Sequence, residues 1–168
     1  MSQVFEYDIP RACVQEVSAS LNWKEFADEL QRTEDKAGAL RAFGELLMQT
    51  VIDAADRYRD RTGEMIEQVA RQTGVNFPHR AQRYLEHMLL CARPADRYGL
   101  LKSTPGELRF TISSCSILPM VAPGAPCREL CVAALQRACQ KTGDDVTVEV
   151  VHWLPTDGRC EFSLKPRH

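Results

Sequence analysis

The amino-acid sequence predicts an α+β fold in which a helical N-terminal half packs against a small antiparallel sheet. Residues 22–92 are rich in Ala, Leu, Glu, Gln and Arg, and their apolar positions follow helical spacing. Strand-like alternation begins only later in the chain, where the turn residues of 155–158 separate two strands and predict a hairpin. We therefore expect a single domain over 1–168, with a helical layer over about 20–93 and a cysteine-rich α/β unit over about 105–168.

The first helices can be located from their caps. Ser20 or Asn22 can cap one helix, and Thr33 or Asp35 can cap the next. The second helix has apolar residues at i, i+3 and i+4 positions, which predict its buried face: Leu40, Phe43, Leu47, Val51, Ala54 and Tyr58.

Glycine and proline divide the rest of this half. Gly63 and Gly74 interrupt later turns, and Pro78 is expected at the first position of a helix that Pro94 ends. The half is interpreted as a packing layer of three or four helices; the alternative is that a long amphipathic helix mediates a homodimer. Two histidines are expected at the surface or rim of these helices, without a role: His79 and His87.

The composition limits the classes of binding partner and the cellular compartment that we expect. The net charge is −2, which gives no electrostatic case for a nucleic acid or an anionic membrane surface. No stretch approaches the roughly 18–20 apolar residues of a membrane span, and the N-terminus lacks the pattern of a signal peptide. We therefore expect a cytoplasmic protein without a membrane span, in which thiols stay reduced.

Seven cysteines stand out, and five of them lie at or after Cys115. Reduced cysteines gathered in one region are metal ligands, a nucleophile or small core residues. Cys13 and Cys91, outside this region, are expected to be structural. Cys115 follows a strand and precedes a proline-rich loop, a common place for site residues.

The cysteine-rich region predicts a strand, a helix and a hairpin. Alternation over 108–112 indicates a strand, and three prolines and a glycine in 116–126 indicate a loop. A helix is expected over 127–141, and two strands are expected over 146–153 and 159–165.

The hairpin brings a histidine and a cysteine together. If Trp153 pairs with Arg159, His152 lies opposite Cys160 on one face of the sheet. The other pairs on that face are apolar: Val150 with Phe162, and Val148 with Leu164. His152 and Cys160 are thus expected at the turn end of a core face.

The helix adds two thiols to this pair. Cys127 and Cys131 are four residues apart and share one helical face. With His152 and Cys160 they form an S₃N set suited to Zn²⁺, and soft thiolates also allow iron or an iron–sulfur cluster. Glu149 has the wrong strand parity and reaches this site only if a bulge redirects it.

Three other interpretations of the thiols remain open. In the first, Cys131 is the nucleophile of an enzyme, or a metal-bound water hydrolyses a C–N bond of a small ring. In the second, a redox or iron–sulfur centre uses four cysteines: Cys115, Cys127, Cys131 and Cys160. In the third, the cysteines are inert core residues.

The pattern Glu-x₂-His-x₇-Cys over 149–160 resembles the end of the 4-vinyl-reductase (hydrocarbon-binding) domain, as does the Gly-x-Cys-x-Phe ending over 158–162. The resemblance implies a zinc-containing protein that senses or carries a small apolar or aromatic ligand in a cavity beside the metal. His152 stands where the family has a cysteine. The ligands that the resemblance implies are Cys127 or Cys131 together with Glu149, His152 and Cys160.

A second resemblance covers the same region. The strand Phe-x-Ile-x-x-Cys over 110–115 and the ending over 158–162 are similar to the L-2-amino-thiazoline-4-carboxylic acid hydrolase family, in which Cys131 corresponds to a helix cysteine. This resemblance implies a hydrolase of a small cyclic C–N substrate. The sequence departs from that pattern at Ser116, where the family usually has proline, and at Ala134, where an aspartate is expected.

Overall fold

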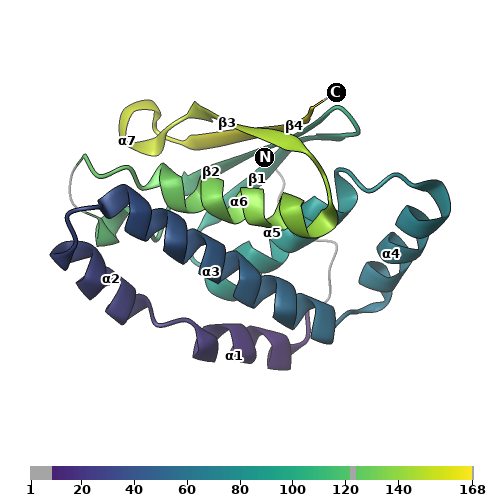
Figure 1. Ribbon diagram of the computed structural model, residues 1–168, viewed down its shortest axis with the longest axis horizontal. Coiled ribbons are helices and arrows are strands. Elements are labelled where there is room, and N and C mark those ends of the chain that lie inside the picture. The colour runs from purple at the N-terminus through teal and green to yellow at the C-terminus, as the bar shows by residue number, and fades with distance from the viewer. Residues whose placement is uncertain (1–8, 122–123, 168) are drawn as a thin grey trace.

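In the computed structural model, described over residues 9–121 and 124–167, the helices that precede the last two strands lie on one face of a four-stranded sheet (Figure 1). The fold is α+β, as the sequence predicts. None of the described helices has the length and apolar character needed to cross a membrane.

Five helices precede the sheet. Three begin at a capping side chain: Asn22 accepts from the Glu25 N–H, Asp35 from the Gly38 N–H and Asp60 from the Gly63 N–H. The helices are α1 (Arg11–Ser20), α2 (Trp23–Arg32), α3 (Lys36–Arg57), α4 (Arg61–Thr73) and α5 (His79–Ala92). Helix α1 was not predicted from the sequence. Pro78 was predicted as the first residue of α5 but is its N-cap, one residue earlier.

The second half has the strand–helix–hairpin order that the sequence predicts, with one further strand in front. Its elements are β1 (Arg97–Thr104), β2 (Glu107–Ser114), the 3₁₀ turn η1 (Leu118–Met120), α6 (Arg128–Thr142), β3 (Val146–His152), α7 (Leu154–Asp157) and β4 (Cys160–Pro166). The strand order is β1-β2-β4-β3, with every neighbouring pair antiparallel. Strand β1 was not predicted, because Lys102 and Ser103 interrupt its apolar pattern.

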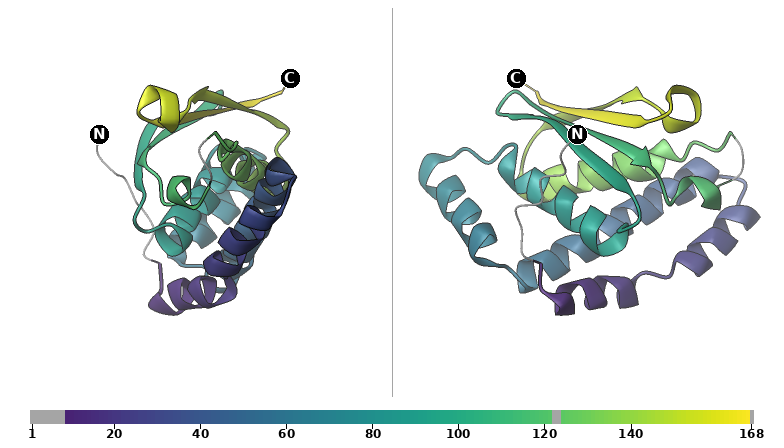
Figure 2. Two further views of the ribbon diagram at one scale, coloured as in Figure 1. Left: turned by 90° about the vertical axis from the view of Figure 1, so that its left-hand side faces the viewer. Right: turned by 180° about the vertical axis from the view of Figure 1, so that it is seen from behind.

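The core lies between the sheet and the helices. Figure 2 shows α6 beneath the sheet and α3 beneath α6. Gly44 of α3 permits this close packing, since a Cβ at Gly44 would lie 2.2 Å from the Leu130 carbonyl oxygen of α6. On the inner face of the sheet, Phe110 stacks on Phe162 with ring centroids 5.3 Å apart. Phe110, Phe162 and Leu130 are buried, so this packing supplies the apolar burial that stabilises the fold.

The structure corrects the prediction for one histidine. His79 is exposed, as expected, but His87 is buried on α5, and its Nδ1 lies 2.8 Å from the Arg83 carbonyl oxygen. Helix α5 is buried around most of its circumference, because it lies between the other helices and the sheet.

Candidate functional site

A buried ion pair lies at the end of α5. Arg93 is the C-cap of α5, and its Nε lies 2.5 Å from Oδ2 of Asp96; both side chains are 0% exposed. The other carboxylate oxygen of Asp96 accepts a hydrogen bond from the Ser116 N–H at 2.6 Å. The carboxylate compensates the guanidinium charge, as a buried charge requires.

The rest of the Arg93 guanidinium points to sulfur. Its Nη1 donates to Sγ of Cys131 at 3.2 Å, and its Nη2 donates to Sγ of Cys115 at 3.4 Å. Cys131 comes from the first turns of α6, and Cys115 follows β2. Arg93 therefore connects α5, α6 and the end of β2 through one planar group.

Two further thiols are held by donors from the hairpin. The indole Nε1 of Trp153 donates to Sγ of Cys127 at 3.3 Å, and the backbone N–H of Leu154 donates to Sγ of Cys160 at 3.3 Å. The guanidinium of Arg128 lies 5.0 Å from the centroid of the Trp153 ring, a cation–π arrangement that orients the indole.

Four cysteine sulfurs thus each accept an N–H hydrogen bond, and three of the four cysteines are buried, with Cys115 half-buried. We call them the thiol cluster: Cys115, Cys127, Cys131 and Cys160. The buried thiols of Cys13 and Cys91 lie elsewhere, on α1 and α5, and hydrogen-bond to each other. Donors directed at sulfur are typical of sites where the sulfur carries negative charge.

Burial sets the protonation of the cluster. It raises the pKa of the Cys160 thiol to about 11, against the opposing effect of the Leu154 N–H. It also raises the pKa of Cys115 and of Cys127, although Arg93 and Trp153 respectively act in the opposite direction. Without a metal, these three thiols are therefore protonated at neutral pH.

The arginine stays charged. Burial alone lowers the pKa of the Arg93 guanidinium, but Cys131, Asp96 and Cys115 outweigh burial, and its pKa is raised. A permanent positive charge therefore lies against two of the sulfurs.

The hairpin register differs from the prediction at its turn end. Val150 pairs with Phe162 and Val148 with Leu164, as predicted, but His152 pairs with Glu161 instead of Cys160. A β-bulge between Val150 and His152 causes this shift by one residue and turns the side chain to the other face.

On that outer face, His152 has acidic neighbours. Its Nδ1 lies 3.6 Å from Oδ2 of Asp157, and its Nε2 lies 3.9 Å from Oε2 of Glu161. Glu149 pairs with Ser163, and its side chain is exposed. The structure thus places Cys127, Cys131 and Cys160 in one cluster with Cys115, and it places His152 and Glu149 outside it.

Across residues 9–121 and 124–167, no group of three or more His, Cys, Asp or Glu side chains is arranged to hold a metal ion. The cluster has the chemistry of a soft-metal site, but its sulfurs are held on N–H donors rather than directed at one point.

Sequence reasoning missed the two charged residues of the site. Arg93 and Asp96 flank Pro94 just after an apolar helix, and a charged pair at such a boundary is usually solvated. Only the return of β2 and α6 over this loop buries the pair.

The comparisons with known proteins assign no family. No family model matches the chain, and no curated protein matches it. A structure from a study of haem distortion in the H-NOX family is 12% identical, with a TM-score of 0.46, over 88% of this chain and 73% of that chain. An Fe(II) unliganded H-NOX protein mutant from K. algicida is 12% identical, with a TM-score of 0.43, over 94% of this chain and 88% of that chain. Both TM-scores are below 0.5, so they define neither a family nor a ligand for this chain.

Proposed function

We propose that this protein is a small-molecule-binding protein whose thiol cluster holds a soft metal ion, zinc in the first instance and iron as the alternative. The observation that supports the proposal is that all four sulfurs accept N–H hydrogen bonds within the protein. Such donors stabilise thiolates and orient metal ligands. Four sulfur ligands suit tetrahedral Zn²⁺ or an iron–sulfur centre, and they disfavour Mg²⁺ and Ca²⁺.

The charges of the site are compatible with this proposal. Arg93 and Asp96 together carry no net charge, so Zn²⁺ with four thiolates would leave a net charge of −2, which the N–H donors to the sulfurs would stabilise. The hydrogen bonds from Arg93 can persist, since a metal-bound thiolate still accepts an N–H. Because the sulfurs do not converge on one point, the proposal requires the cysteine side chains to rotate when metal binds. Cys115 takes the place that the sequence analysis gave to His152.

Metal analysis of reduced, anaerobically purified protein tests the proposal. We expect stoichiometric zinc in colourless protein; a visible absorption band with stoichiometric iron would support the iron alternative. Cys131→Ser and Cys160→Ser are expected to lose most of the metal. Cys139→Ala, at a buried cysteine of the same helix outside the cluster, is the matched control and is expected to keep it. Metal far below stoichiometry in undamaged protein would overturn the proposal.

Metal binding is also expected to depend on pH. The raised pKa values of Cys115, Cys127 and Cys160 mean that bound metal must displace thiol protons. Affinity for added Zn²⁺ should therefore fall as pH is lowered from 8 to 6, with protons released on binding. Equal affinity at the two pH values would exclude the thiols as ligands.

The contact between Arg93 and Cys131 favours a second candidate function, a cysteine-dependent hydrolase of a small cyclic C–N substrate. The Arg93 guanidinium donates to Sγ of Cys131 at 3.2 Å, and the thiolate is the nucleophilic form of a cysteine. The Cys131 thiolate would attack the ring carbon, the ring C–N bond would break as the leaving nitrogen takes a proton from water, and the remaining hydroxide would displace Cys131 from the carbon and restore the thiolate. In metal-free protein, iodoacetamide should then modify Cys131 faster than Cys139, and Cys131→Ala should abolish ring-opening of amino-thiazoline carboxylate. Turnover that survives Cys131→Ala would exclude this candidate.

A further inference from the structure

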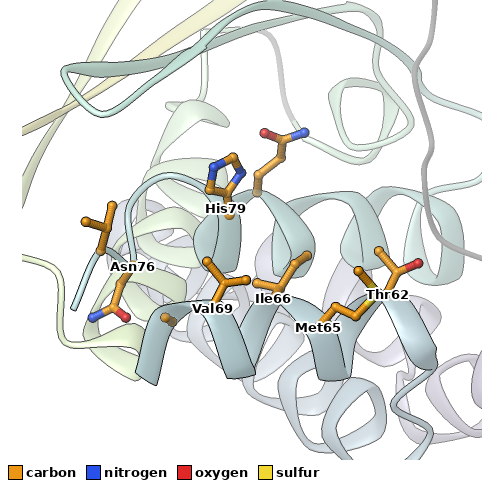
Figure 3. A pocket seen from close by; sticks show the side chains of 9 residues that line it. Thr62, Met65, Ile66, Val69, Asn76 and His79 are labelled. Carbon is orange, nitrogen blue, oxygen red and sulfur yellow. The ribbon is translucent and has the colours of Figure 1, made fainter. Parts of the chain in front are cut away.

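An apolar groove lies between α4 and α5, at the end of α5 opposite Arg93 (Figure 3). Its volume is about 270 Å³. Figure 3 shows Thr62, Met65 and Val69 rising from α4 toward the groove, with His79 of α5 across from them. Because α5 has 14 residues, the groove lies roughly 20 Å from the thiol cluster.

The groove exposes side chains that a folded chain normally buries. Met65 is 55% exposed, Val69 is 51% exposed and Val75 is 52% exposed, and all three line the groove. The described residues include only two other large hydrophobic side chains with comparable exposure, Leu46 and Leu101. An apolar patch concentrated in a concave site is typical of a ligand-binding surface.

The lining of the groove also includes four polar residues: Thr62, Asn76, His79 and Gln82. The Gln82 side chain is fixed on both sides: Oε1 accepts from the Ser103 hydroxyl at 2.7 Å, and Nε2 donates to Glu86 at 3.0 Å. That Nε2 carries a second hydrogen. His79 is exposed and adds a ring that can donate or accept.

The lining includes no Asp, Glu, Lys or Arg. The nearby charges are used elsewhere: Arg80 pairs with Glu67 at 2.9 Å and also donates to the Thr142 carbonyl oxygen. An ionic ligand would thus lose water without gaining a counter-charge, so the groove favours an uncharged molecule.

We propose that this groove is a binding site for a small, uncharged and largely apolar molecule, of the size of one or two rings, with a hydroxyl or similar polar substituent. The volume is near the lower end for ligand pockets, which excludes long lipids. The inference rests on the proposed function for the idea that a small molecule is bound at all. The groove differs in location from the cavity that the 4-vinyl-reductase resemblance implies, because that cavity would lie beside the metal.

Titration with 2-naphthol tests this site, because the probe has two rings and a hydroxyl group and is neutral at pH 7. In amide NMR spectra of the full chain we expect shifts concentrated in residues 62–82. Val69→Trp, which fills the groove from an exposed position, and Met65→Gln should each weaken binding at least tenfold. Leu101→Gln, at another exposed apolar position on β1, is the control and should bind normally. The anion 2-naphthoate should bind at least tenfold more weakly than 2-naphthol.

The outcomes separate this site from the metal proposal. Shifts that cluster around Cys115, Cys131 and Cys160 would overturn the groove and place the ligand at the thiols. Concentration-dependent dimerisation that Val69→Asp abolishes would show a second copy on this face, and would also overturn it. Val69→Trp should keep its full metal content. If wild-type protein holds no metal and still binds 2-naphthol at the groove, the groove stands and the metal proposal fails.

Discussion

Removing the charge of Arg93 should destabilise the protein strongly. In Arg93→Met, Asp96 keeps only the Ser116 N–H as a partner and becomes an uncompensated buried carboxylate. Breaking a buried pair from one side costs roughly 3–5 kcal/mol of unfolding free energy. We expect a loss of unfolding free energy in this range, because both side chains are fully buried in the wild-type protein. Cys131 and Cys115 also lose their hydrogen-bond donor when the guanidinium is removed.

Urea unfolding at pH 7 in reducing buffer measures this loss. Arg41→Met is the matched control, because Arg41 pairs with Glu129 at 3.4 Å with both side chains substantially exposed. Removing such a surface pair should cost about 1 kcal/mol or less. A double-mutant cycle of Arg93→Met and Asp96→Asn should also be non-additive. The double variant should be about 2 kcal/mol more stable than the sum of the two single losses predicts.

The reasoning would be refuted if Arg93→Met and Arg41→Met cost the same, or if the cycle were additive. Either result would mean that water or another group compensates Asp96 when the guanidinium is gone. The site would then not depend on the buried pair to hold its thiols.

Two further predictions concern the helices. Burial, and after it the charge of Arg83, lowers the pKa of His87 to about 4. Since the unfolded chain takes up this proton near pH 6.5 and the folded chain only near pH 4, stability should fall between these values as pH drops, by up to about 3 kcal/mol. His87→Gln should flatten that slope in urea unfolding at pH 7 and 4.5, and an unchanged slope would exclude His87 as its cause. Gly44→Ala should lower the free energy of unfolding by about 1–3 kcal/mol, because its Cβ would clash with the Leu130 carbonyl oxygen. Gly106→Ala is the control and should be close to neutral in thermal unfolding, because the nearest atom to its Cβ would be 3.9 Å away. Equal effects of the two substitutions would exclude the clash.

Short-range patterns in the sequence predicted most helices and strands of this fold. Helical spacing placed the buried face of α3, and Asn22 and Asp35 cap their helices as expected. Strand alternation placed Val150 opposite Phe162. These features depend on residues that are near one another in the chain, or on a turn of defined length, and such patterns are readable from the sequence.

Tertiary structure decided the composition of the candidate site. The bulge before His152 adds one residue to a strand, and alternation alone cannot locate it. Arg93 contacts Cys115 and Cys131, which are 22 and 38 residues away in the sequence. No local sequence pattern relates residues at these separations. The sequence by itself determined an α+β chain with a concentration of soft thiols. Only the packing of α5, α6 and β2 decided that two of the thiols contact a buried ion pair, because Arg93 ends α5, Cys131 lies on α6 and Cys115 follows β2.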